Sequence, residues 1–196
     1  MSEKTVAIEV HGNIDKRARR TRELLADALL ALGAQNALDD VAVGDLAEEA
    51  GVSRSTFYQH FASKDDFLVR SWVGLLEATE AAYAKHYPDR TDIIASRPLF
   101  HHVAQARDFV RSLVRSEVYP RQMAAGEERL REIAEANLRR RMPRWSEQRR
   151  RETAIYIAGG FVGLLRWWME SSLKRSPEEM QAAFERLSES ALAGEM

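Results

Sequence analysis

A glycine at position 51 lies between two short segments whose apolar residues recur every three or four positions. That spacing predicts two amphipathic helices, one from Val43 to Ala50 and one from Ser53 to His60. Gly51 permits the positive φ that a sharp turn needs, and the small Ala47 lets the two helices approach closely. Val52 is expected to plug the turn. The two segments are therefore predicted to form a helical pair that meets at a steep angle.

The second of these helices has an apolar side and a polar side. Phe57 and Phe61 form an i, i+4 pair, which is expected to anchor the helix on the core. Leu46 and Ala50 complete the buried side of the preceding helix. The side chains left facing outward are Arg54, Ser55, Thr56, Tyr58 and Gln59. These residue types suit contacts to phosphates and base edges, and the alternative is a helical hairpin with an ordinary polar surface.

Several short motifs follow one another between Val41 and Lys64. They are Leu46-Ala47, Ala50-Gly51-Val52-Ser53, Thr56-Phe57-Tyr58, His60-Phe61 and Ser63-Lys64. Together they resemble the DNA-binding domain of the TetR family of bacterial regulators, over roughly residues 15 to 70. The resemblance implies an all-α homodimer whose N-terminal three-helix domain carries a helix-turn-helix. The larger C-terminal part would bind a small molecule and dimerise, which gives about nine helices in total.

The resemblance also assigns roles to individual residues. The helix after Gly51 would enter the major groove of double-stranded DNA, at a palindromic operator. Tyr58, Thr56 and Lys64 would contact phosphates, and Arg54, Ser55 and Gln59 would lie closest to bases. The full predicted DNA-binding set is Arg17, Arg20, Thr21, Val43, Gly44, Ser53, Arg54, Ser55, Thr56, Tyr58, Gln59, His60 and Lys64.

Two features modify this expectation. At position 42 the family often has a threonine that caps the helix and touches a phosphate, and Ala42 does neither. A cap by Asp39 or Asp40 would repel phosphate, so we expect one contact fewer, or a backbone-only contact at Val43 and Gly44. Between Lys16 and Arg22 there are five basic residues and no acid, which is either a solvated face or a second contact to the DNA backbone.

The chain divides into three parts on this interpretation. Residues 1–13 are expected to be a disordered arm, residues 14–70 the DNA-binding domain and residues 71–196 the ligand-binding and dimerisation domain. The predicted helices outside 43–60 run from Asp15 to Leu32 with Gly33 as the stop, Lys64 to His86, Pro98 to Val118, Gly126 to Arg141, Ser146 to Leu173 and Pro177 to Leu192.

The helix from Ser146 to Leu173 is apolar on all sides, and such a helix is expected to be buried on all sides. A second copy of the chain is the simplest surface to cover its outer side, and the alternative is the central core of a monomer. A two-fold four-helix interface with the last helix is therefore predicted. The predicted dimerisation residues are Ile157, Phe161, Leu164, Leu165, Trp168, Phe184 and Leu187.

A ligand pocket is expected in the C-terminal part, for an unknown small-molecule effector. The candidate lining residues are Phe100, His101, Phe109, Tyr119, Met123, Trp145, Tyr156 and Trp167, although aromatic residues at helical spacing are also typical of a core. Neighbouring residues on a helix point about 100° apart, so His101 and His102 do not readily share a metal ion. No cofactor and no metal are predicted.

Composition narrows the class of protein further. There is no cysteine, which fits a reducing cytoplasm, and the longest apolar run, Ala154 to Leu165, is too short to cross a bilayer. No nucleophile elbow, phosphate loop or zinc-ligand helix indicates an enzyme. We expect a cytoplasmic, ligand-responsive repressor. Residues 15–70 carry eight Lys and Arg against ten Asp and Glu, which favours an alternative: a binding module of this fold with weak or lost DNA binding.

Overall fold

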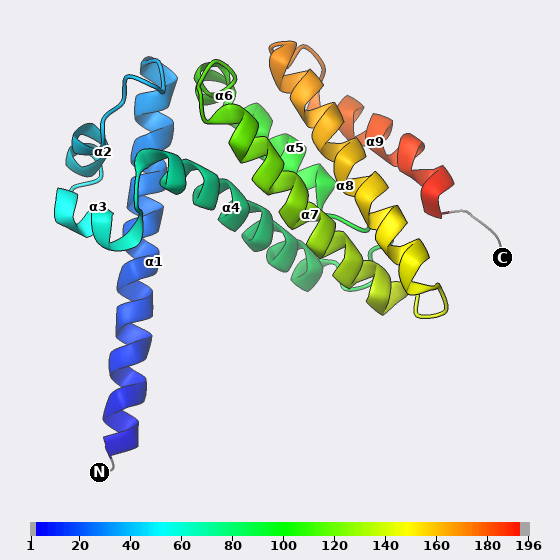
Figure 1. Ribbon diagram of the computed structural model, residues 1–196, viewed down its shortest axis with the longest axis horizontal. Helices are drawn as coiled ribbons and strands as arrows, with labels where there is room; N and C mark the ends of the chain where they lie inside the picture. The colour runs from blue at the N-terminus through cyan, green and yellow to red at the C-terminus, as the bar shows by residue number, and fades with distance from the viewer. Residues whose placement is uncertain (1–2, 193–196) are drawn as a thin grey trace.

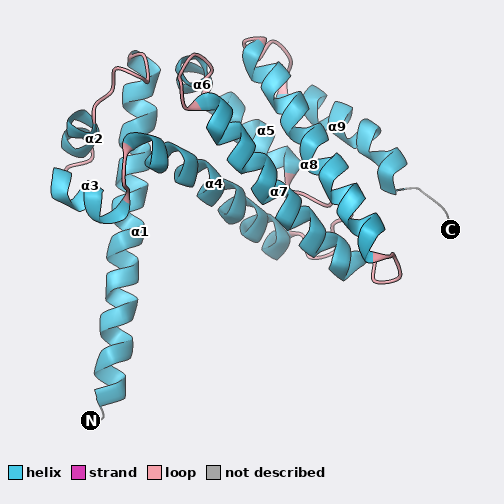
Figure 2. Cartoon of the chain, viewed as in Figure 1, coloured by secondary structure: helices cyan, strands magenta, loops and turns pink. Residues whose placement is uncertain are grey.

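The computed structural model describes the backbone of residues 3–192, and the side chains of 17–189 and 191–192. Within that range the chain forms nine helices and no strand, which confirms the predicted all-α fold (Figures 1 and 2). The helices are α1 (Glu3–Gln35), α2 (Val43–Glu49), α3 (Arg54–His60), α4 (Lys64–His86), α5 (Ser96–Gln105), α6 (Arg107–Leu113), α7 (Tyr119–Arg141), α8 (Glu147–Glu170) and α9 (Pro177–Leu192).

The helices form two regions. In Figure 1, α2 and α3 lie against one end of α1, and we call α1–α3 the head. Helix α4 leaves the head and runs into the region formed by α4–α9, which we call the body. One continuous core of buried apolar side chains extends through both regions, from Leu25 in α1 to Phe184 in α9. No helix of the described range has an apolar stretch long enough to cross a membrane.

Serine caps fix several helix starts, as local sequence predicts. The Ser53 hydroxyl accepts a hydrogen bond from the Thr56 N–H at 3.1 Å, and Ser63 accepts one from Asp66 at the same distance. Ser146 caps α8 in this way through the Arg149 N–H. Ser176 and Glu179 form a reciprocal pair at the start of α9.

The structure corrects three predicted boundaries. Helix α1 begins at Glu3 rather than at Asp15, and residues 1–2 lie outside the described range. The segment predicted as one helix from Pro98 to Val118 is divided into α5 and α6 at Ala106. Helix α7 begins at Tyr119 rather than Gly126, with Pro120 in its first turn, where a missing N–H costs nothing.

Gly33 does not stop the first helix, which continues to Gln35. Gly33 is buried against α6 instead, and a Cβ there would lie 2.7 Å from the Phe109 ring. Its lack of a side chain therefore allows close packing between head and body. The next residues are fixed to the same helix, because the Ser112 hydroxyl donates to the Asn36 carbonyl at 2.9 Å and accepts from the Leu38 N–H at 2.7 Å.

Helix α8 has a buried side and an open side in the single chain. Most of the predicted dimerisation residues are buried within the chain's own core, which corrects that prediction for Ile157, Phe161, Leu165, Trp168 and Phe184. Phe161 packs on Phe100 and Phe184, with ring centroids 5.0 and 5.4 Å away. Leu164 is half-buried and Leu187 is 49% exposed. The open side consists of other residues, namely Ile155, Tyr156, Gly160, Gly163 and Trp167.

Candidate nucleic-acid interface and ligand cavity

The turn between α2 and α3 has the predicted geometry. Gly51 adopts φ of 64°, a left-handed conformation that glycine takes without a Cβ clash. The N–H of Gly51 donates to Glu48 at 3.0 Å and the N–H of Val52 donates to Ala47 at 2.9 Å, so the end of α2 is satisfied within the turn. Helix α3 then begins at Arg54 behind its Ser53 cap.

An aromatic cluster fixes the inner side of α3. Phe57 is fully buried, and its ring centroid lies 5.6 Å from Phe61 and 5.7 Å from Phe67 of α4. The Tyr58 ring packs edge-on against Phe57 at 5.5 Å, which limits its rotation while its outer part stays exposed. The position of α3 therefore depends on apolar packing, and its polar side is held outward.

The outer side of α3 carries exposed polar side chains. Arg54, Ser55 and Gln59 are exposed, and Tyr58 is 52% exposed. Thr56 is half-buried, because its hydroxyl hydrogen-bonds the Ser53 hydroxyl at 2.8 Å. His60 is half-buried, and its carbonyl accepts a hydrogen bond from Arg70 at 2.8 Å. Four of the predicted side chains thus form one accessible surface, which we call the α3 surface: Arg54, Ser55, Tyr58 and Gln59.

Lys64 lies at the start of α4 but is held by the head. Its ammonium donates to the carbonyls of Leu38 and Asp39 at 2.8 and 2.9 Å. Of its three N–H bonds, one is left for another acceptor. The predicted role of Lys64 as a phosphate contact is therefore reduced, and its clear role is to hold the α1–α2 loop.

The start of α2 has no side-chain cap at Ala42. The Asp45 carboxylate accepts a hydrogen bond from the Ala42 N–H at 2.8 Å. A negative charge thus lies beside the half-buried Val43 and Gly44, where a phosphate would have to approach. The carboxylate at this helix start therefore belongs to Asp45 rather than to Asp39 or Asp40, and the loss of one phosphate contact stays a prediction.

The basic residues predicted to contact DNA from α1 lie near the middle of that helix. Arg17 and Arg20 are exposed, and Thr21 is half-buried. Arg17, Thr21 and the buried Leu25 are spaced by four residues, so they lie along one face of the helix. Arg17 therefore continues the face of α1 that packs on the head core.

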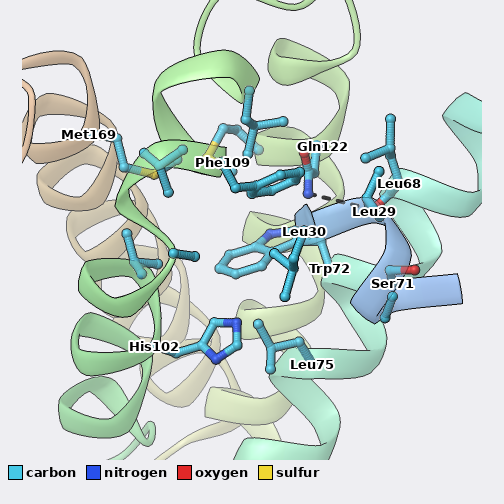
Figure 3. A pocket seen from close by; sticks show the side chains of 16 residues that line it. Leu29, Leu30, Leu68, Ser71, Trp72, Leu75, His102, Phe109, Gln122 and Met169 are labelled. Atoms are coloured by element: carbon cyan, nitrogen blue, oxygen red, sulfur yellow. Dashed lines mark hydrogen bonds between the residues drawn. The ribbon is translucent and has the colours of Figure 1, made fainter. Parts of the chain in front are cut away.

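A separate cavity of about 160 Å³ lies between the head and the body. Apolar side chains from five segments line it (Figure 3). They include Ala26, Leu29 and Leu30 of α1, Leu68, Trp72 and Leu75 of α4, Val103, Ala106, Phe109, Val110 and Leu113 of the α5–α6 region, Met123 of α7 and Met169 of α8. Because α1 contributes to the lining, anything bound there touches the head directly.

The polar lining residues of the cavity are Ser71, His102 and Gln122. Gln122 is 5% exposed, and its Oε1 atom has no hydrogen-bond partner, while its Nε2 reaches the Leu68 carbonyl only at 3.5 Å. Burial lowers the pKa of His102 below its ordinary value, so its imidazole is neutral at pH 7. The described residues provide no charged side chain in the lining.

Trp72 forms the middle of the cavity wall. In Figure 3 its indole lies between His102 and Leu75 on one side and Phe109 and Gln122 on the other. The Nε1 atom of Trp72 is buried without a partner and lies against Gly126 of α7, where any Cβ would collide with it. Gly126 therefore provides the space in which the indole is seated.

Two of the predicted ligand-binding residues, Phe109 and Met123, line this cavity. The others lie elsewhere: Phe100 is in the core, His101 pairs with Glu178 at 3.4 Å, and Trp145 is stacked under Arg149. Tyr119 is buried outside the lining, and burial raises its pKa to about 12. Tyr156 and Trp167 are exposed on α8. The sequence analysis did not predict His102, Gln122 or Trp72 as lining residues, although an amide at helical spacing from the apolar Val118 and Tyr119 was a usable signal.

Comparison with known proteins identifies the class. A family model described as bacterial regulatory proteins of the tetR family matches residues 25–70, and one described as a transcriptional regulator C-terminal region matches residues 95–190. The chain belongs to the TetR family of bacterial regulatory proteins, as the helix-turn-helix motifs predicted.

Two curated relatives match part of the chain. The HTH-type transcriptional regulator AcrR of Shigella flexneri is 33% identical over 57 residues, which are 29% of this chain and 26% of that protein. The uncharacterized HTH-type transcriptional regulator YwcC of Bacillus subtilis (strain 168) is 47% identical over 49 residues, which are 25% and 22%. The chain thus spans about a quarter of the length of these curated relatives.

Solved structures share the whole fold. A TetR-family transcriptional regulator from Syntrophomonas wolfei aligns with a TM-score of 0.69 at 17% identity, over 91% of this chain and 98% of that one. FadR of Thermus thermophilus, in complex with lauroyl-CoA, aligns with a TM-score of 0.56 at 18% identity, over 89% and 96%. At these identities the likeness shows the fold alone.

Proposed function

We propose that this protein is a homodimeric, ligand-responsive transcriptional regulator that acts in the cytoplasm and represses by binding a palindromic operator. The observation that carries the proposal is the α3 surface: a short helix anchored by the buried Phe57 holds Arg54, Tyr58 and Gln59 outward. Arg54 and Gln59 have the hydrogen-bonding groups that read base edges in a major groove. Tyr58 and the α1 residues Arg17 and Arg20 supply contacts to the DNA backbone.

The open side of α8 supports dimerisation. Ile155, Tyr156 and Trp167 are each about half exposed, which is unusual for apolar side chains of this size. A Cβ at Gly160 or Gly163 would meet nothing within 4 Å, so a second helix has room to approach closely. The Tyr156 hydroxyl donates to the Leu187 carbonyl of α9 at 3.1 Å, which joins α8 and α9 into one surface. Two such surfaces related by a two-fold axis would bring two α3 helices to two half-sites.

The cavity supports regulation by a small molecule. Helix α6 lines the cavity with Phe109 and Leu113 and also holds the α1–α2 loop through Ser112. Occupancy that shifts α6 relative to α1 would change the orientation of the head. A ligand with different affinities for the two head orientations would therefore change DNA binding.

Selection of bound duplexes from a random pool tests the proposal. We expect enrichment of a palindrome whose half-sites lie about one helical turn apart, with affinity that falls steeply with salt. Trp167→Glu should produce monomers in light scattering and weaken operator binding, whereas Tyr87→Glu, a change at another exposed aromatic residue, should leave the dimer intact. Equal binding of all duplexes at physiological salt would contradict specific regulation.

A second candidate function is a binding module of this fold with weak or lost DNA binding. The Asp45 carboxylate at the start of α2, the two carbonyls that hold Lys64 and the acidic balance of residues 15–70 favour it. On this alternative, Tyr58→Ala and Lys64→Ala would leave the biological phenotype unchanged.

A further inference from the structure

The cavity between head and body restricts the charge of what it can hold. None of its lining side chains carries a charge at pH 7, since burial keeps His102 neutral and Ser71 and Gln122 do not ionise. A charged molecule would lose its hydration there without gaining a counter-charge, which is expensive. The chemistry of the lining therefore selects a neutral molecule.

The cavity also restricts size. Its volume is about 160 Å³. An apolar protein cavity of about 150 Å³ accommodates benzene, so this space fits a single six-membered ring with one or two small substituents. A twelve-carbon acyl chain attached to coenzyme A, as bound by Thermus thermophilus FadR, is larger than this space. The apolar walls formed by Leu30, Leu75 and Phe109 suit contact with the faces of such a ring.

One buried acceptor then defines the substituent. The Oε1 atom of Gln122 has no donor, although the residue is only 5% exposed and lines the cavity. A buried acceptor without a donor costs about 1–3 kcal/mol, and a ligand that donates a hydrogen bond removes that cost. The imidazole of His102 has no hydrogen-bond partner in the described residues either, so a second polar group has a place at the other side of Trp72 (Figure 3).

We infer that this cavity binds a small, neutral, single-ring molecule whose hydroxyl group donates a hydrogen bond to Gln122. The inference rests on the proposed function, because it names the class of effector for that regulator. The inference goes further than the proposed function in two respects. Gln122 distinguishes a ring that carries a hydroxyl group from one that does not, and the neutral lining disfavours anions.

Calorimetric titration of the full-length dimer without DNA tests this inference separately from the regulatory function. The probes are phenol, toluene, benzoate and laurate. Phenol should bind roughly threefold to tenfold more tightly than toluene, the factor that one net hydrogen bond provides, and benzoate and laurate should bind more weakly than either. In Gln122→Leu the ratio of the phenol and toluene affinities should fall to about one.

Two further variants keep the test decisive. Gln148→Leu makes the same change at an exposed position of α8 and should preserve the preference for phenol. Leu75→Trp fills the cavity and should weaken phenol and toluene together, and this variant decides the matter if Gln122→Leu does not fold. The inference is overturned if neither ring binds, if toluene equals phenol in the unmodified protein or if an anion binds best. It is also overturned if Leu75→Trp leaves phenol binding unchanged.

Discussion

The α3 surface and the cavity both present polar groups without partners, but their surroundings differ. Arg54 and Gln59 make no hydrogen bond to the described part of the chain, and water satisfies them because they are exposed. The Oε1 atom of Gln122, in contrast, is buried behind apolar walls. An unpaired group costs little in water and about 1–3 kcal/mol when buried. The first surface therefore suits the highly charged, hydrated partner proposed above, and the second suits the proposed small neutral ligand.

The largest expected effect lies on the α3 surface. Arg54→Ala should weaken operator binding by about 1–3 kcal/mol per half-site, because a lost contact to a base leaves that base edge unpaired. The affinity for phenol should stay unchanged, since Arg54 does not line the cavity. Fluorescence anisotropy with the selected duplex measures the first effect and calorimetry the second. Arg144→Ala, a change at an exposed arginine beyond α7, is the matched control.

Substitutions in the cavity wall should change the free energy of unfolding rather than the contacts to DNA. Gly126→Ala places a Cβ against Trp72 Nε1, and such overpacking costs about 1–3 kcal/mol of unfolding free energy. Gly74→Ala, at a helical glycine with open space around it, should raise stability by about 0.5–1 kcal/mol. Urea denaturation of both variants gives the comparison. An equal effect of the two substitutions would show that Gly126 does not seat the indole.

A matched pair of glutamines separates the two environments. Without ligand, Gln122→Leu should leave stability unchanged or raise it by about 1 kcal/mol, because it removes a buried acceptor that has no donor. Gln59→Leu on α3 should change stability by less than about 0.5 kcal/mol, since the side chain is exposed. Thermal unfolding of the ligand-free proteins measures both. A strong loss of stability in Gln122→Leu would mean that its amide already has a partner.

The smallest expected effect is a dependence of stability on pH. Burial lowers the pKa of His102, so between its folded pKa and its ordinary value of 6.5 the unfolded chain binds more protons than the folded one. Stability should therefore fall as the pH drops below about 6.5 and be retained above it. His102→Phe should reduce that slope. Unfolding free energies at pH 7 and pH 5.5 provide the check.

Local sequence predicted the head closely. The turn at Gly51, the cap at Ser53 and the anchor at Phe57 depend on residues within a few positions of one another, so their pattern is visible in the chain. Lys64 was the exception, because its acceptors at Leu38 and Asp39 are distant in sequence. The spacing of apolar residues along the chain does not show that the Lys64 ammonium donates to these two carbonyls.

The body was predicted less well, because its features arise between helices. The middle of α8, Ala154 to Leu165, is apolar on all sides. Only its packing on the rest of the chain shows that Phe161 is buried while Tyr156 is exposed. The break at Ala106 and the role of Gly33 depend on how α6 meets α1. The position of Gln122 beside the cavity follows from the same tertiary packing.

The sequence by itself determined the helical class, the helix-turn-helix and the residues of the α3 surface, since short-range hydrogen bonds, steric limits and a 3.6-residue period act along the chain. Tertiary structure decided the cavity, its polar residues and the open side of α8. A helix pattern defines which residues share a face, but only the packing of distant segments determines which face meets which.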